Sequence, residues 1–144
     1  DSPVICEYLD SLQLDVARKC FPGEGAARWQ ALRRQALADG VMDAVVMVRY
    51  ESHMRPEEAG SWLDMLEAQR SKVTRSLDAM EMEAVAGLVG VDIGTIAFGC
   101  ALGYLDLRLP EHCWRDGRPA LAAWFEEFMQ RESMKRTEVD PSVD

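Results

Sequence analysis

The first three residues, Asp1, Ser2 and Pro3, are of types that together could bind a small zwitterion. A serine followed by a proline is a typical helix start, with Ser2 as the N-cap and Pro3 at the first helical position, where no N–H is needed. The free N–H groups and the positive end of that helix attract a carboxylate, and the Asp1 carboxylate can hold an amine. This corner could bind both charged ends of an amino acid, or it could be an ordinary helix cap.

No motif for metal chemistry accompanies this corner. The four cysteines have no metal-like or redox-like pair spacing, and two of them, Cys6 and Cys100, lie in apolar helical runs, where a thiol behaves as a small hydrophobic group. His112 and Cys113 form one adjacent pair of soft ligands, which is too few for zinc. We therefore expect no metal site, free thiols, and a reducing, cytoplasmic compartment.

The composition disfavours several classes of partner. The 144-residue chain is 48% hydrophobic and 28% charged, which is typical of one folded domain. Its formal net charge of -9 argues against binding to nucleic acid and against docking on anionic lipid. The longest apolar run, from Ile93 to Leu105, is shorter than the ~18 residues that a membrane span needs, so it predicts a buried core helix.

Helical periodicity accounts for most of the chain. Apolar residues recur at helical spacing, and no segment shows the period-two alternation of a strand. Proline is favoured at the first position of a helix, and glycine and proline mark the loops between helices. The predicted helices span about Pro3–Leu12, Ala26–Ser52, Pro56–Glu83 and Ile93–Leu107, with a fifth that begins near Pro119.

The helix over Ile93–Leu107 is expected to lie at the centre of the fold. It is apolar nearly all round, Cys100 included, and a helix of this kind is buried on all sides. The helix over Ala26–Ser52 carries an apolar stripe that begins at Trp29 and is wide enough to pack on more than one neighbour. The sequence therefore predicts an all-α helical bundle around one central buried helix.

Four stretches of the chain, in this order, resemble the C-terminal helical domain of a bacterial glutathione S-transferase. Asp1–Leu9 is similar to the family's acidic-Ser-x-x-Ile-x-x-Tyr-Leu segment. Ala36–Ala44 resembles its first long helix, Asp92–Leu107 its core helix with a capping box, and Pro119–Thr137 its last helix and exit. Each stretch is a weak signal alone, but the ordered set covers nearly the whole chain.

One position departs from the family pattern. The family usually has Ser or Thr at the start of the core helix and Asp three residues later, whereas this chain has Asp92 and then Thr95. Asp92 is still a good N-cap, and we expect the reciprocal bond from the third position to be weaker.

The resemblance also implies a domain organisation. In this family a thioredoxin-like βαβαββα domain precedes the helices and supplies the Ser, Cys or Tyr that stabilises the glutathione thiolate. Residues 1–14 are then expected to be the last helix of that domain, and residues 15–144 the all-helical C-terminal domain. The catalytic residue is expected outside this chain, so the chain alone should neither turn over substrate nor bind glutathione tightly. Its first helix and the cleft side of the second should be exposed.

The resemblance implies two sets of binding residues. Asp1 would take the amine of the γ-glutamyl end of glutathione, and Ser2 its carboxylate. The helical wall of the pocket for an electrophile would include Arg34, Ala38, Met42 and Tyr104. As an alternative, Met42 and Tyr104 are core residues and Arg34 is solvated, and spacing alone cannot separate the two.

The function implied is a detoxifying transferase that joins glutathione, as co-substrate, to an electrophilic small molecule. Such a protein would be a homodimer and would need no metal. The alternative is a non-catalytic binding or assembly module, since the same fold serves both roles. A third possibility is a helical bundle that resembles the family by pattern alone.

Overall fold

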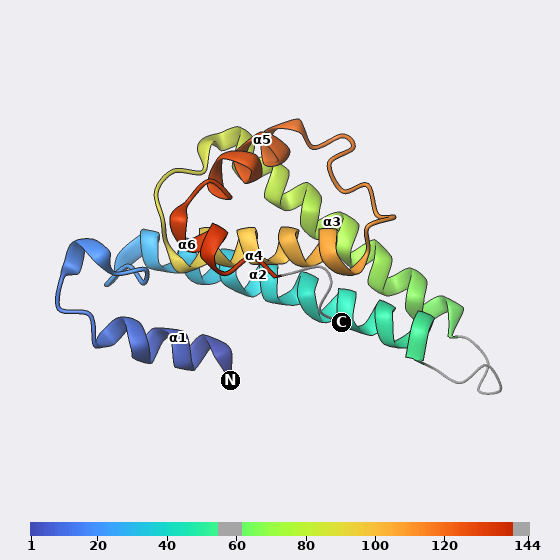
Figure 1. Cartoon of the computed structure of the whole chain (residues 1–144), viewed down its shortest axis with the longest axis horizontal. Helices are drawn as coiled ribbons and strands as arrows, with labels where there is room; N and C mark the ends of the chain where they lie inside the picture. Colours follow the sequence, from blue (N-terminus) through green and yellow to red (C-terminus); the bar gives the residue numbers. More distant parts are fainter. Residues whose placement is uncertain (55–61, 140–144) are drawn as a thin grey trace.

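The computed structural model describes residues 1–54 and 62–139, in which helices are joined by loops (Figure 1). These residues contain no strand, so the predicted all-α fold is confirmed. The predicted start of the third helix, Pro56, lies outside the described residues. The elements in chain order are α1 (Ser2–Ser11), η1 (Val16–Arg18), α2 (Gly25–Arg49), η2 (Tyr50–Met54), α3 (Leu63–Gly87), α4 (Ile93–Arg108), α5 (Pro119–Phe128) and α6 (Glu132–Arg136).

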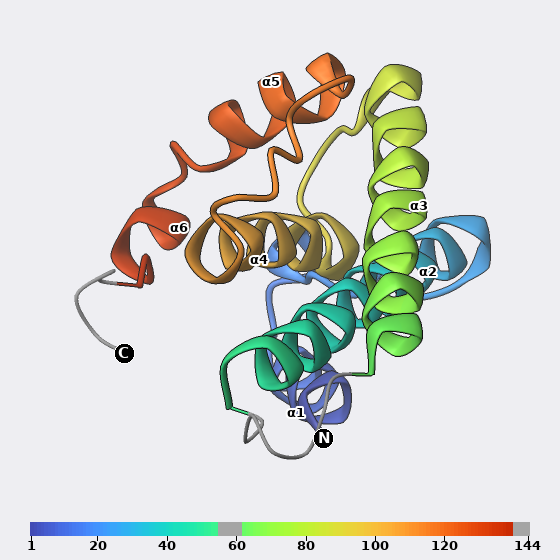
Figure 2. The same cartoon turned by 90° about the vertical axis from the view of Figure 1, so that its right-hand side faces the viewer.

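Four helices surround one hydrophobic core. Helix α2 packs on both α4 and α3, and α5 packs on both α3 and α4, so the four contacts close into a ring (Figure 2). Apolar residues of all four helices point inward and are fully buried, as a bundle requires. The largest of these side chains are Phe98, Leu77, Met80, Leu102, Leu105 and Leu121, and Trp114 of the loop between α4 and α5 is buried with them.

Helix α4 supplies more buried residues than its neighbours, as the sequence predicts for a central helix. One expectation was wrong, because Cys100 is exposed. The helix has an uncovered strip at helical spacing, and Cys100 lies in it between Ile96 and Tyr104, which are half-buried. A helix with neighbours on only part of its circumference leaves such a strip.

The core stripe of α2 also differs from the prediction at its first residue. Trp29 is 70% exposed, whereas Ala31, Gln35, Ala38 and Val41 are buried. Trp29 lies two residues before Ala31, which is about 200° around the helix, so the two side chains face opposite ways. The prediction therefore placed Trp29 on the wrong face of α2.

The loop between α4 and α5 is anchored by a buried tryptophan that the sequence did not single out. The indole Nε1–H of Trp114 donates to Asp106 Oδ1 at 2.7 Å. Arg115 binds both oxygens of the same carboxylate at 2.7 and 2.8 Å and covers the Trp114 ring.

The start of α5 is held by a side chain of α3. The Glu81 carboxylate accepts the N–H of Leu121 at 2.7 Å, which satisfies a free donor in the first turn of α5.

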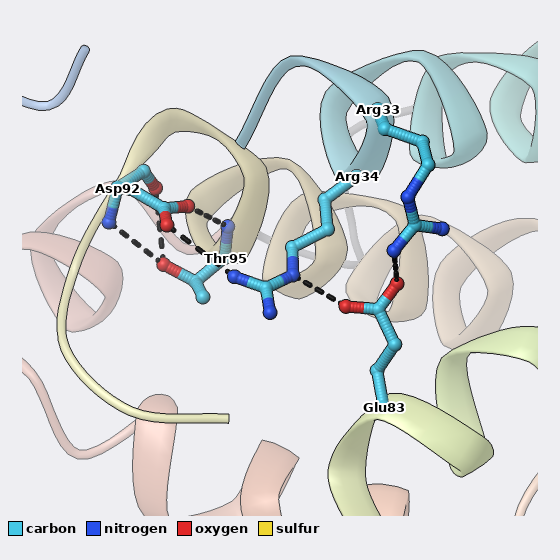
Figure 3. Close-up of polar contacts among 5 residues, drawn as sticks. All are labelled: Arg33, Arg34, Glu83, Asp92 and Thr95. Carbon is cyan, nitrogen blue, oxygen red and sulfur yellow. Dashed lines mark hydrogen bonds and ion pairs between the residues drawn. The ribbon is translucent and has the colours of Figure 1, made fainter. Parts of the chain in front are cut away.

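The start of α4 is held by a complete capping box. Asp92 Oδ1 accepts the N–H of Thr95 at 2.8 Å, and the Asp92 N–H donates to the Thr95 hydroxyl at 2.9 Å (Figure 3). The reciprocal bond is therefore present at ordinary length, although threonine is not the usual residue at this position.

The same cap joins three helices. The Arg34 Nε of α2 donates to the Glu83 carboxylate of α3, and Arg34 Nη1 lies 3.4 Å from Asp92 Oδ2 (Figure 3). Arg33 binds the other oxygen of Glu83. Because the Arg34 side chain is only 15% exposed, these charge-assisted bonds are shielded from solvent.

Close approach of α4 to α2 requires a glycine at position 94. A methyl group there would lie 2.5 Å from Arg34 Cβ and 2.6 Å from the carbonyl oxygen of Ala31. We expect Gly94→Ala to lower the free energy of unfolding by about 1–3 kcal/mol, the usual cost of overpacking. Gly103→Ala in the same helix meets nothing within 4 Å and should be neutral or stabilising by up to about 1 kcal/mol. Urea unfolding would measure both, and equal effects of the two substitutions would contradict the packing argument.

Loss of the cap should also destabilise the protein. Asp92→Ala removes the acceptor for Thr95 and one partner of Arg34, so we expect a loss of about 1–3 kcal/mol. Asp92→Asn keeps a capping oxygen but not the charge, and its melting temperature should lie between those of the alanine variant and the wild type. An Asp92→Ala protein that melts with the wild type would reject the assignment of the cap.

Candidate functional site

A cavity of about 170 Å³ lies where the N-terminus of α1 meets the middle of α2. It is lined by Asp1, Ser2, Pro3, Asp39, Met42 and Asp43. The structure therefore brings together three residues that the sequence analysis placed in binding roles: Asp1, Ser2 and Met42. A helix N-terminus and several carboxylates share this cavity, so it presents both a partial positive charge and negative charges to a ligand.

The N-cap of α1 is Asp1 and not Ser2, which corrects the predicted start of the helix. Asp1 Oδ1 accepts the N–H of Ser2 at 2.8 Å, and the Asp1 carbonyl oxygen accepts the N–H of Ile5 at 3.1 Å. Ser2 and Pro3 are the first helical residues. The Ser2 N–H that was expected to hold a ligand carboxylate thus has a carboxylate partner within the chain, and a ligand would have to exchange with it.

Two further carboxylates in the cavity were not predicted as site residues. Asp39 and Asp43 lie four residues apart on one face of α2, opposite Asp1. Burial, followed by the charge of Asp43, raises the pKa of Asp39 above its usual value. The signal was present in the sequence as two acids at helical spacing beside Met42, but only the position of α1 shows that they face a cavity.

Two of the four predicted wall residues are accessible in part. Met42 is half-buried and lines the cavity, and Tyr104 is half-buried in the uncovered strip of α4. Ala38 is fully buried in the core, so in this conformation a ligand cannot contact it. Arg34 lies away from the cavity lining, and its guanidinium is engaged by Glu83 and Asp92. The structure therefore does not bring Arg34 and Ala38 to the cavity with Asp1 and Met42.

Another cavity, of about 230 Å³, lies between α5 and the segment that joins α3 to α4. Leu88, Trp124, Phe128 and Arg131 contribute to its lining. No residue with a predicted binding role lines it.

The described part of the chain, residues 1–54 and 62–139, holds no group of three or more His, Cys, Asp or Glu side chains placed to bind a metal ion. Within the same residues, no helix is both long enough and apolar enough to cross a membrane.

The outer face of α1 is apolar and uncovered. Its inner, half-buried face consists of Pro3, Cys6 and Asp10, and these residues contact the rest of the molecule. The apolar residues on the other side are more than half exposed, as expected from the sequence, and they are Val4, Ile5, Tyr8, Leu9 and Leu12. Contiguous exposed apolar surface of this kind usually marks a contact with another domain or protein.

These features define a class: an all-helical domain with a central capped helix and a cavity at the N-terminus of the first helix. The family model of the glutathione S-transferase C-terminal domain matches residues 61–127. The chain is also 37% identical, over 142 residues, to the uncharacterized GST-like protein YibF of Escherichia coli (strain K12). That match covers 96% of this chain and 68% of the E. coli protein. The chain therefore belongs to the glutathione S-transferase family.

Solved structures of family members agree with the fold. Two are crystal structures of a glutathione transferase family member from Pseudomonas fluorescens Pf-5, one with bound glutathione and one with bound S-(propanoic acid)-glutathione. They are 46% identical to this chain, with TM-scores of 0.91 and 0.90, and each covers 97% of it. The chain spans 67% and 70% of those chains. A glutathione S-transferase from Methylobacillus flagellatus KT, with glutathione bound, is 35% identical with a TM-score of 0.88. This match covers 97% of this chain and 69% of the other.

The raised pKa of Asp39 gives a test of the cavity's electrostatics. Since the folded state holds this proton more tightly than the unfolded state, the contribution of Asp39 to stability is complete below the unfolded pKa of about 3.9. It is lost as the pH rises through the folded pKa. We expect Asp39→Asn to raise the melting temperature at neutral pH and to have little effect below about pH 4. Asp116→Asn, in an exposed loop, is the control and should show no such pH-dependent gain. A variant that is less stable than the wild type at neutral pH would refute the raised pKa.

Proposed function

We propose that this protein is a glutathione transferase that conjugates glutathione to electrophilic small molecules, and that the helical chain forms the side of the site that receives the electrophile. The observation that carries the proposal is the cavity that joins Asp1 and Ser2 to Met42. Support comes from family members, 46% and 35% identical, that were solved with glutathione bound.

Charges in the cavity fit the γ-glutamyl end of glutathione. In this proposal the ammonium group lies among the carboxylates of Asp1, Asp39 and Asp43, and the carboxylate lies at the N–H and hydroxyl of Ser2. On binding, the Asp1 carboxylate exchanges its bond to the Ser2 N–H for a charge-assisted bond to the ammonium. The positive end of α1 stabilises the ligand carboxylate. No metal takes part in this arrangement.

Met42 and Tyr104 are the wall residues that remain in the proposal, together with the uncovered strip of α4. Their role is to hold an apolar electrophile near the glutathione sulfur, which lowers the entropic cost of the reaction. Arg34 and Ala38 are left out because the first is held by two carboxylates and the second is fully buried. No residue of this chain is assigned to activation of the thiol.

Thiol activation is proposed to come from the rest of a thioredoxin-like domain, of which α1 is the last helix and whose other elements would pack on the exposed apolar face of α1. The face is wide and unpartnered in the described chain, and the cavity with Asp1 lies at the end of the same helix. Such a domain would bring its thiol-stabilising residue beside the cavity. We further propose a cytoplasmic homodimer in which α2 contributes to the interface.

The proposal is tested on the complete gene product by titration calorimetry with glutathione and by conjugation of a chloronitrobenzene. We expect Asp1→Asn to weaken glutathione binding by roughly 10- to 150-fold, since it removes a charge-assisted bond of about 1.5–3 kcal/mol. Asparagine is as good an N-cap as aspartate, so α1 is preserved. Asp116→Asn removes the same charge from an exposed loop and should bind glutathione as the wild type does.

The outcomes separate the candidate functions. Wild-type protein that binds no glutathione would refute the proposal. Binding without conjugation of any electrophile would favour a non-catalytic binding module. Equal affinity of Asp1→Asn and the wild type would remove Asp1 from the site.

A further inference from the structure

Two cysteines from separate elements pack on one small apolar cluster. The cluster consists of Phe21, Ala31 and Ile93, and both Cys6 of α1 and Cys20 of the following loop contact it. Both thiols are half-buried and free. The sequence shows no paired spacing here, because Cys6 and Cys20 lie fourteen positions apart.

The backbone at Cys20 is clamped against the inner face of α1. Its N–H donates to Asp10 Oδ1 at 2.6 Å, and the N–H of Phe21 lies 3.4 Å from Asp10 Oδ2. On the other side, the Cys20 carbonyl oxygen accepts the N–H of Ile93 at 2.8 Å. Cys20 is therefore held between α1 and the start of α4.

Cys6 lies one turn before Asp10 on the same face of α1. Side chains four residues apart in a helix have Cβ atoms about 5–6 Å from each other. Asp10, whose carboxylate accepts the N–H of Cys20, is thus the neighbour of Cys6 on the inner face of α1. Both cysteines also pack on the same apolar cluster. The neighbouring residues Pro3, Cys6 and Asp10 are the half-buried strip by which α1 contacts the body of the molecule.

We propose that Cys6 and Cys20 form a reversible dithiol–disulfide pair that exchanges with small disulfides such as glutathione disulfide. One protein thiolate attacks the small disulfide, forms a mixed disulfide and releases the first glutathione. The second protein thiolate then attacks the protein sulfur of that mixed disulfide and releases the second glutathione. The two protein thiols are oxidised, the glutathione disulfide is reduced, and the two thiol protons pass to the two glutathione thiols.

The environment of Cys20 affects the rate of this exchange. Burial, followed by the nearby carboxylate of Asp10, raises the pKa of the Cys20 thiol. Since the thiolate is the reactive form, little of it is present at neutral pH, and disulfide closure should accelerate as the pH rises.

The disulfide would fix α1 to the body of the molecule. The polar contacts that attach α1 to the body include the hydrogen bonds of Asp10 and an ion pair between Glu7 and Arg28. A covalent link that closes a short loop restricts the unfolded chain and stabilises the fold. A consequence that rests on the proposed function is that oxidation would also fix the helix that carries Asp1 and Ser2.

The pair is tested on the complete gene product by equilibration with glutathione disulfide and, separately, with oxidised dithiothreitol. Free thiols are then alkylated, and the protein is digested and analysed by mass spectrometry. We expect a peptide pair linked through Cys6 and Cys20 with both oxidants, and a higher melting temperature of the oxidised protein. After treatment with glutathione disulfide, the Cys6→Ser and Cys20→Ser variants should each retain glutathione as a mixed disulfide. Neither variant should show the rise in melting temperature. Cys113→Ser, in an exposed loop, should behave as the wild type.

Several results would overturn the pair. Alkylation of both Cys6 and Cys20 in folded protein with excess oxidant would do so, as would a link from Cys6 to Cys100. Oxidised dithiothreitol contains no glutathione, so a Cys6–Cys20 link formed with it would not depend on glutathione binding. A Cys6–Cys20 link in a protein that does not bind glutathione would support the disulfide pair and refute the proposed function. A protein that binds glutathione but forms no Cys6–Cys20 link would support the proposed function and refute the pair.

Discussion

The arrangement of the helices depends on the contact between α2, α3 and the start of α4. Arg34 joins Glu83 of α3 to Asp92, and Asp92 in turn caps α4. Gly94 lets the first turn of α4 approach the backbone of α2 at Ala31. Three helices are thus positioned by one half-buried arginine and two carboxylates, where a partly buried ion pair is strengthened because solvent screens it less. The core packs behind this contact.

The first helix is attached in a different way. Helix α1 contacts the body through a narrow strip and leaves its wide apolar face uncovered. Its N-terminus nevertheless supplies half of the cavity lining, so the geometry of the cavity depends on a helix with few internal contacts. In the proposed protein, the rest of a thioredoxin-like domain covers the outer face of α1, and a disulfide holds its inner face.

The cavity also concentrates charge at a cost in stability. Asp39 is half-buried, and this burial together with the charge of Asp43 disfavours its ionised form and raises its pKa. Carboxylates that repel one another around a cavity are typical of sites that bind a cation or an ammonium group, because the ligand supplies the missing charge. The half-buried side chain of Met42 adds an apolar group to the lining of this cavity.

The sequence by itself determined the helices, the central position of α4 and the cap at Asp92, because hydrophobic period and capping chemistry are local properties that the residues carry with them. A family resemblance also assigned binding roles to Asp1, Ser2, Arg34, Ala38, Met42 and Tyr104, and of these Asp1, Ser2 and Met42 line the cavity. Only the tertiary structure decided that Trp29 and Cys100 face outward, that Arg34 joins three helices, and that Asp39 faces Asp1. Each of these depends on which neighbour covers a given side of a helix, and periodicity alone does not contain that information.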